Sequence, residues 1–198
     1  MRISLSWLFR VCRDGNYSSV GKTLAKIHIT DNTLFIFYHS SGRDSKIEEL
    51  KSWILNLIRI KVKVDSKTYV HSGFNAIADS VMAYTKNMIV RHHKSRIVLC
   101  GYSQGGAVAS IVQRKLDMDN VHCITFAQPK SYGLRTPKQK NLHRVYVRGD
   151  KVTHLPYFGY KHFGKPMAMG MFRLIPRIKY HYPKVYEKHL KGRCIDVR

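Results

Sequence analysis

Residues 96–116 read RIVLCGYSQGGAVASIVQRKL, and this stretch decides the fold. Its first part, Ile97–Cys100, is a short apolar run of the kind that forms a strand buried on both faces of a sheet. After Gly105, apolar side chains recur at helical spacing. These positions are Ala107, Val108, Ile111, Val112 and Leu116. The stretch therefore predicts a strand, a sharp turn and an amphipathic helix.

The turn in this stretch has the pattern Gly-x-Ser-x-Gly, with Gly101, Ser103 and Gly105. A serine at the apex of a strand-to-helix turn takes up strained backbone angles, and the flanking glycines let strand and helix pass closely. The N–H of Gln104 would then point to where an oxyanion forms. A plain structural turn is the alternative, since Gly and Ser are common in loops. The buried strand before the turn and the helix after it favour a nucleophile elbow.

Composition indicates one globular domain with an unusual charge. The 198 residues suffice for a substantial core, and 44% of them are hydrophobic. Lys and Arg number 35 against 12 Asp and Glu, which gives a net charge of +23. From Lys130 onwards there are 17 basic and 3 acidic residues, so this part carries +14. Such a surface attracts polyanions: nucleic acid, anionic lipid headgroups or an acidic partner.

The cysteines and the apolar segments of the sequence indicate the cellular compartment in which the protein works. The cysteines, which form no Cys-x-x-Cys pair and have no metal-ligand spacing, are Cys12, Cys100, Cys123 and Cys194. Cys100 and Cys123 lie in apolar runs, so we expect them to be small core residues. This usage suits a reducing compartment, and the apolar stretch near the N-terminus is closed early by Arg10, unlike a signal peptide. No window is long and apolar enough for a membrane span, so we expect a cytoplasmic protein.

The rest of the chain alternates strand-like and helix-like segments. Strands are predicted at 23–29, 33–38, 60–64, 121–126 and 144–147, one helix at 47–58, and another that follows Val70–Phe74 and reaches about His93. This order predicts an α/β fold with a mostly parallel sheet flanked by helices. We expect a single domain over residues 1–198, with residues 1–20 as an N-terminal lead-in.

An elbow serine needs a base to take its proton and an acid to orient that base. In α/β-hydrolases these partners follow the serine in the order acid, then histidine. Of the five carboxylates after Ser103, Asp150 directly follows a predicted strand, at the sheet edge where such folds place their sites. It is the best candidate for the acid. The residues alone leave the base open among the histidines that follow: His154, His162, His181 and His189.

Five blocks resemble motifs of the class 3 (fungal-type) lipases. Tyr38–Ser41 is similar to their Phe-Arg-Gly-Thr/Ser box, and Trp53–Leu57 is similar to the Asp-Trp-x-x-Asn-Leu that follows it. Val70–Phe74 matches Val-His-x-Gly-Phe, and Thr125–Pro129 matches Thr-Phe-Gly-x-Pro. Arg144–Val152 matches Arg-Val-Val-Asn-x-x-Asp-x-Val. Because the blocks run in family order, the chain from about residue 35 to residue 190 resembles this family.

The resemblance implies an α/β-hydrolase fold and a catalytic triad. It assigns the nucleophile to Ser103, the orienting acid to Asp150, the base to His181, and the oxyanion donors to Ser41 and the Gln104 N–H. The family's histidine usually precedes a final helix in a His-x-x-x-Tyr-like context, which favours His181 over His162 and His154. The elbow Gly-Tyr-Ser-Gln-Gly itself resembles that of cutinases, because Tyr102 and Gln104 replace residues common in class 3 lipases.

Two segments leave two interpretations open. Residues 42–52 form either a small lid over the site or only the start of a surface helix. Residues 158–173 carry Phe and Met side chains between lysines and an arginine. This pattern indicates either an acyl-binding or membrane-touching rim or a core-packing loop.

The sequence predicts a serine hydrolase that cleaves carboxylic esters through an acyl-enzyme, as a triacylglycerol lipase or a phospholipase A type enzyme. No cofactor is expected, and the histidines have no spacing that would assemble a metal site. The expected partners are a lipid or ester substrate and an anionic membrane surface. The alternative is an inactive hydrolase-fold protein that binds nucleic acid or anionic membrane through its basic surface. No nucleic-acid motif is present, and the basic residues follow no single helical stripe.

Overall fold

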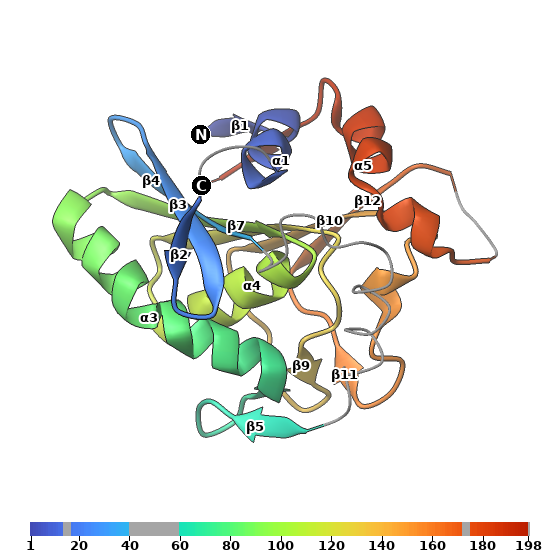
Figure 1. The fold of residues 1–198 in the computed structure, drawn as a ribbon, viewed down its shortest axis with the longest axis horizontal. Helices are drawn as coiled ribbons and strands as arrows, with labels where there is room; N and C mark the ends of the chain where they lie inside the picture. Colours follow the sequence, from blue (N-terminus) through green and yellow to red (C-terminus); the bar gives the residue numbers. More distant parts are fainter. Residues whose placement is uncertain (14–16, 40–59, 172–174, 198) are drawn as a thin grey trace.

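The computed structural model describes residues 1–13, 17–39, 60–171 and 175–197, which form a layered α/β structure (Figure 1). Within these ranges the central sheet has seven strands, in the order β12-β10-β8-β7-β4-β3-β2. From β12 to β4 the strands pair in parallel, and β3 and β2 are added antiparallel at one end. Their bounds are β2 Ser18–Val20, β3 Thr23–Ile29, β4 Thr33–His39, β7 Arg96–Tyr102, β8 Val121–Phe126, β10 Leu142–Val147 and β12 Lys165–Met169.

Central strands of this sheet read as continuous apolar runs because both of their faces are covered. β4 is buried from Thr33 to Tyr38, and every residue of β8 is buried. The edge strand β2 exposes Ser18 and Ser19. The predicted strands at 23–29, 33–38 and 121–126 are confirmed, and the one at 144–147 begins two residues earlier than expected.

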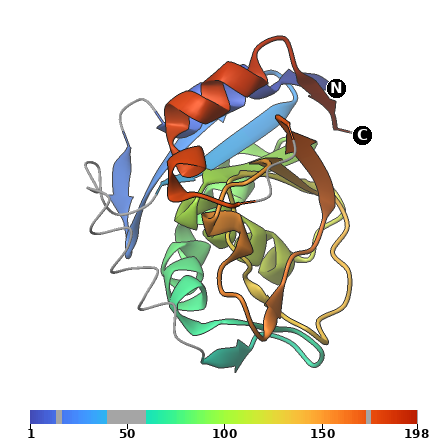
Figure 2. The ribbon, with the colours of Figure 1, turned by 90° about the vertical axis from the view of Figure 1, so that its right-hand side faces the viewer.

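Helices cover both faces of the sheet (Figures 1 and 2). The α3–α4 face carries α3 (Ser72–His92) and α4 (Gln104–Leu116), and the α1–α5 face carries α1 (Leu5–Arg13) and α5 (Pro183–Leu190). Short 3-10 turns, η1 (Val152–His154) and η2 (Ile178–His181), lie in the connections after β10 and before α5. The helix predicted after residues 70–74 is α3, and the one predicted after the elbow is α4, so both are confirmed.

Two smaller sheets complete the described fold. β1 (Arg2–Ser4) pairs antiparallel with β13 (Cys194–Asp196), which joins the two ends of the chain. A four-stranded sheet has the order β11-β9-β6-β5. Its strands are β5 Lys61–Lys63, β6 Tyr69–His71, β9 Tyr132–Gly133 and β11 Tyr160–Lys161. The half-exposed strand predicted at 60–64 is therefore confirmed as β5.

The sheet separates two hydrophobic cores. On the α3–α4 face, Val81 of α3 and Ile111 of α4 pack with the inner side chains of β4, β7 and β8. On the α1–α5 face, Phe9 of α1 packs among Tyr102, Phe126 and Tyr186, with ring centroids 5.2 to 5.7 Å apart. The buried side chains of α1 are thus part of this core.

Further expectations can be compared with the fold. A mostly parallel sheet flanked by helices in an α/β fold is confirmed. Cys100 and Cys123 are fully buried and free, as expected of core residues. No helix within the described residues is both long and apolar enough to cross a membrane. The helix predicted at 47–58 and the lid considered at 42–52 lie outside the described residues.

Candidate active site

The strand β7 and the helix α4 meet at Ser103. This serine has φ 53° and ψ −121°, a conformation that residues with a side chain rarely adopt. Any Cβ at Gly101 would overlap the backbone of Gly105, and any Cβ at Gly105 would overlap the carbonyl of Tyr38 on β4. Both glycines are therefore required for the close approach of strand and helix, and the turn holds the Ser103 side chain at the carboxyl edge of the sheet.

A backbone donor at the start of α4 lies next to this serine in the chain. α4 begins at Gln104, so the Gln104 N–H belongs to the first-turn amides that have no acceptor within the helix. The helix dipole adds partial positive charge at the same end. An oxygen that gains negative charge beside Ser103 would be stabilised there. The second predicted donor, Ser41, lies outside the described residues.

A chain of hydrogen bonds links Ser103 to a histidine and a carboxylate from later in the sequence. Ser103 Oγ lies 2.8 Å from His181 Nε2, and His181 Nδ1 lies 2.9 Å from Asp150 Oδ2. All three residues are buried, although Ser103 keeps 6% of its surface exposed and His181 keeps 4%. Asp150 follows β10, and His181 ends the turn η2 just before α5. Elements far apart in the chain thus converge on one site.

Contacts of the carboxylate orient the histidine. Asp150 Oδ1 accepts the N–H of Val152 at 3.0 Å, and Oδ2 accepts the hydroxyl of Tyr186 at 2.7 Å. An ionised carboxylate only accepts hydrogen bonds, so the Nδ1 of His181 carries the proton that it shares with Asp150. The Nε2 lone pair then faces Ser103 and can accept its proton. This is the arrangement that a general base requires.

Two tyrosines, the partly buried Tyr102 and the buried Tyr186, hold the histidine and the acid in place. The ring of Tyr102 stacks on the ring of His181, with centroids 5.2 Å apart and planes at 24°, and its hydroxyl donates to the His181 carbonyl. Burial and the nearby charge of Asp150 raise the pKa of Tyr186 well above its usual range, so its hydroxyl keeps the proton that it donates. Phe9 of α1 stacks on Tyr186 and meets Tyr102 edge-on.

Sequence reasoning gave no role to these supporting rings. Tyr186 follows His181 by five residues, and an aromatic residue near a candidate base was the only signal for it. Nothing in the sequence connects Phe9 with the site, because its contacts arise only when α1 packs on the sheet.

The other candidate histidines lie elsewhere. His162 Nε2 donates to the carbonyl of Thr153 at 2.7 Å. Burial, with the nearby charge of Arg144, lowers the pKa of His162 to about 3, although the bond to Thr153 acts in the opposite direction. His154 is exposed in η1, and His189 lies on α5 beside Gly170.

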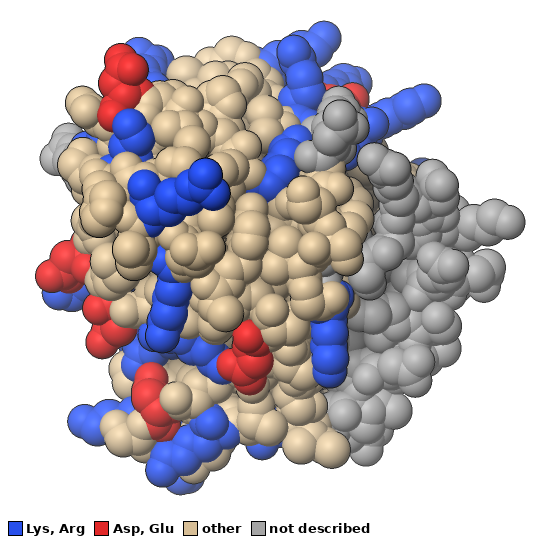
Figure 3. Space-filling view, turned by 60° about the vertical axis from the view of Figure 1, so that its left-hand side comes forward, with Lys and Arg blue, Asp and Glu red and all other residues tan. Residues whose placement is uncertain are grey.

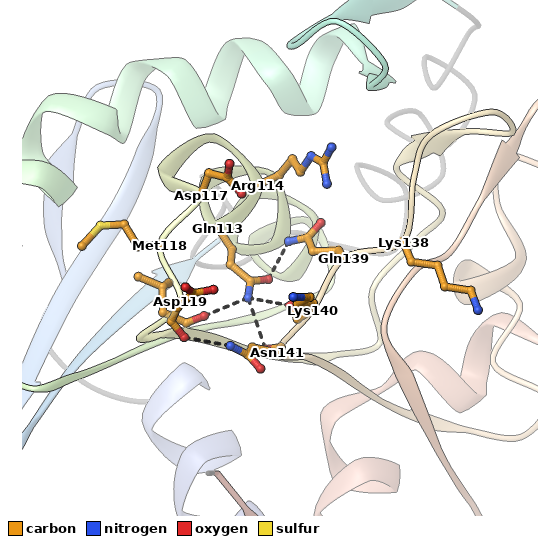
Figure 4. Close-up of a pocket in the computed structure, with 10 residues that line it drawn as sticks. Gln113, Arg114, Asp117, Met118, Asp119, Lys138, Gln139, Lys140 and Asn141 are labelled. Atoms are coloured by element: carbon orange, nitrogen blue, oxygen red, sulfur yellow. Dashed lines mark hydrogen bonds between the residues drawn. The ribbon is translucent and has the colours of Figure 1, made fainter.

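A cavity of about 210 Å³ lies at the opposite edge of the sheet (Figure 4). It is bordered by the end of α4, the start of β8 and the segment before β10. Gln113 lines it, and the amide of this side chain donates to the carbonyls of Val121, Lys140 and Asn141 at 3.0 to 3.2 Å. This amide is used to join the ends of three elements, and the cavity has no contact with the Ser103 site. Nor does the described part of the chain contain three or more His, Cys, Asp or Glu side chains grouped to hold a metal ion.

The fold and the Ser103-His181-Asp150 arrangement define the class of the protein: it has the α/β-hydrolase fold with a serine, histidine and aspartate in hydrogen-bonded order. Residues 39–160 match the family described as Lipase (class 3). The chain therefore belongs to the class 3 lipase family. A comparison with curated proteins gives no match.

Fungal lipases are among the solved structures with a similar fold. The native Rhizomucor miehei lipase propeptide complex is 22% identical, with a TM-score of 0.59, and the match covers 78% of this chain and 55% of that one. The lipase from Rhizopus microsporus var. chinensis is 20% identical, with a TM-score of 0.58, and the match covers 77% of this chain and 59% of that one. The Lip2 lipase of Yarrowia lipolytica is 15% identical, with a TM-score of 0.61, and the match covers 80% of this chain and 66% of that one. The chain thus spans between about half and two thirds of the length of these lipases. The likeness of the elbow to cutinases stays a prediction.

Proposed function

We propose that the protein is a serine hydrolase that cleaves carboxylic esters of lipids. One observation carries this proposal: a buried, continuous set of hydrogen bonds runs from Ser103 Oγ through His181 to Asp150, on a strained turn at the start of a helix. Membership of the class 3 lipase family supports an ester of a fatty acid as the substrate. Burying an aspartate and a histidine costs free energy, so a role in the reaction explains this pair better than a role in stabilising the turn.

The proposed reaction has two halves. Ser103 Oγ attacks the ester carbonyl carbon while its proton passes to His181 Nε2, and the Gln104 N–H stabilises the oxyanion that forms. His181 then gives the proton to the alcohol oxygen as the carbon–oxygen bond breaks, which leaves an acyl group on Ser103. Water attacks this acyl group while its proton passes to His181, the bond between the acyl carbon and Ser103 Oγ breaks, and His181 returns the proton to Oγ as the fatty acid is released. Ser41 is proposed as the second oxyanion donor on the resemblance to the family.

The substrate class can be separated by a direct assay. We propose triacylglycerol or phospholipid as the lipid, and release of fatty acid from emulsified triacylglycerol and from phosphatidylcholine vesicles distinguishes the two. Short and long p-nitrophenyl esters give the acyl-chain preference in solution. The variant Ser103→Ala should lose hydrolysis of every ester that the wild type cleaves. Ser110→Ala, which changes a buried serine of α4, the helix that follows Ser103, should keep it. Equal hydrolysis by wild type and Ser103→Ala would refute the proposal, and no hydrolysis by either would favour the inactive binding protein.

A further inference from the structure

The charge of the molecule does not by itself select a docking face. Figure 3 shows Lys and Arg side chains spread over the visible surface, with Asp and Glu scattered among them. An interfacial contact also needs apolar side chains that are exposed together. Several large apolar side chains that are exposed lie on or beside the four-stranded sheet β11-β9-β6-β5: Ile60, Tyr69, Leu134, Tyr157 and Phe158.

These side chains come from separate parts of the chain, and specific contacts gather them. Tyr160 of β11 donates its hydroxyl to the carbonyl of Ile60 at 3.2 Å, which ties the loop of Phe158 to the start of β5. β11 pairs with β9, and β9 pairs with β6, which carries Tyr69. Leu134 directly follows β9. Phe158 is 89% exposed, so packing among the described residues does not explain a phenylalanine there.

Lysines are interleaved with these apolar side chains. The stem of Lys61 approaches Gly133, and its Nζ lies 5.2 Å from the centre of the Tyr160 ring. Gly159 leaves room for the same ammonium group, because a Cβ there would lie 3.0 Å from it. Lys63 is opposite Tyr69 in the register of β5 and β6. A lysine can bury its aliphatic stem along apolar groups while its ammonium group reaches a charged layer.

Further cations surround the same sheet. Lys130 donates from Nζ to the Tyr157 carbonyl at 3.4 Å, and the Nζ of Lys161 lies 4.6 Å from the centre of the Phe163 ring. The acid in the β5–β6 turn, Asp65, is paired with Arg114 at 3.1 Å. Its charge is therefore already balanced. The face as a whole combines positive charge with exposed apolar and aromatic groups.

We propose that this β5–β11 face, made of Ile60, Lys61, Lys63, Tyr69, Leu134, Tyr157 and Phe158, docks the protein on an anionic lipid surface. Lysines beside aromatic and aliphatic side chains match a bilayer, in which phosphate headgroups lie directly above acyl chains. Nucleic acid offers phosphates and base faces but no apolar layer that would accept Ile60 and Leu134. An anionic membrane is therefore the occupant that fits both features of the face.

The face is joined along the chain to the edge of the candidate active site. The chain runs from Asp150 through η1 to Phe158 within eight residues, and Lys130 N donates to the Leu155 carbonyl between them. If the proposed function holds, docking brings this edge of the site to the surface where lipid esters are found. Binding itself does not depend on the reaction, so it can be measured without turnover.

The test is sedimentation with vesicles of phosphatidylcholine alone and with phosphatidylglycerol added, using protein with Ser103→Ala so that no lipid is consumed. We expect binding to the anionic vesicles only, with loss of binding as salt rises. In that background Lys61→Glu with Lys63→Glu should lower the partition coefficient about 25-fold or more, at about fivefold per lysine. Phe158→Ser should lower it about tenfold.

The matched controls make the same kinds of substitution outside the β5–β11 face: two Lys→Glu changes, and one exposed apolar residue changed to Ser. Lys138→Glu with Lys140→Glu alters two exposed lysines beside the cavity of Figure 4, and Val90→Ser alters an exposed apolar side chain on α3. Both should leave binding nearly unchanged. Equal losses in the two lysine pairs would overturn the proposal in favour of diffuse attraction. It would also be overturned by equal binding to neutral and anionic vesicles, or by tighter binding to a DNA oligonucleotide that Phe158→Ser leaves intact.

Discussion

The two faces of the central sheet position the candidate site by different means. On the α3–α4 face, Ser103 is set by backbone against backbone, since Gly101 contacts Gly105 and Gly105 contacts the carbonyl of Tyr38. On the α1–α5 face, His181 and Asp150 are set by side chains: Tyr102 stacks on the imidazole, and Tyr186 donates to the carboxylate. One face fixes the nucleophile by local geometry, and the other fixes the base and acid by packing.

This difference separates two kinds of sensitivity. Backbone contacts without room for a Cβ fail abruptly when one carbon is added. Loss of one side-chain contact has a smaller effect, because each hydrogen bond or ring contact supplies only part of the free energy that positions His181 and Asp150. Variants on the two faces should therefore affect stability and turnover in different proportions.

Removal of the base should have the largest effect. His181→Ala leaves Ser103 without a proton acceptor, so we expect kcat for ester hydrolysis to fall at least about 10⁴-fold. Steady-state hydrolysis of a soluble p-nitrophenyl ester measures it. As a control, His154→Ala removes an exposed histidine in η1 and should keep full activity. Near-normal activity in His181→Ala would mean that another group serves as the base.

The backbone contact of the elbow should be the next most sensitive feature. Gly105→Ala introduces a Cβ that overlaps the Tyr38 carbonyl, so α4 must shift away from β4. We expect a loss of about 3 kcal/mol in the free energy of unfolding and a fall in kcat of about a hundredfold. Urea unfolding and ester hydrolysis measure the two. Gly73→Ala, whose Cβ would meet only the His71 ring at 3.3 Å, is the control and should change both little. A fully active and stable Gly105→Ala would contradict the account of this face.

A matched pair of tyrosines compares the faces directly. Tyr186→Phe removes a donor to a buried carboxylate and leaves the Val147 N–H without its acceptor, so kcat should fall about tenfold at unchanged KM. Tyr38→Phe removes the 2.7 Å bond to Thr85 on the α3–α4 face. It should cost about 1 kcal/mol of stability with kcat unchanged. If both variants lose activity equally, Tyr186 acts through general stability and not through Asp150.

His162 should affect the stability of the protein at acid pH, because its pKa is lowered from 6.5 to about 3. Between these values the unfolded chain takes up a proton that the native protein does not, so stability falls as the pH drops through this window. For one group the slope is about 1.4 kcal/mol per pH unit. His162→Gln should make the acid side of the stability curve less steep by this amount and leave it unchanged above pH 6.5. Urea unfolding at several pH values checks this, and an identical slope in both proteins would refute it.

The sequence allowed prediction of the parts of this structure that depend on local pattern. Ser103 and its flanking glycines, the buried strands and α4 follow from spacing alone, because steric rules within a few residues dictate them. Asp150 was found from its place after a strand. The choice of His181 needed the family resemblance, since four histidines follow Asp150 and only the folded chain brings one of them to Ser103. The contacts of Phe9 could not be predicted, because they join α1 to α5 across most of the chain.

Labelling with a fluorophosphonate probe tests the central claim most directly, because the probe reacts with a serine only when a base has activated it. The account predicts that the wild type is labelled at Ser103, that Ser103→Ala is not labelled, and that His181→Ala is labelled far more slowly. An unlabelled wild type, or a label on any residue other than Ser103, would contradict it.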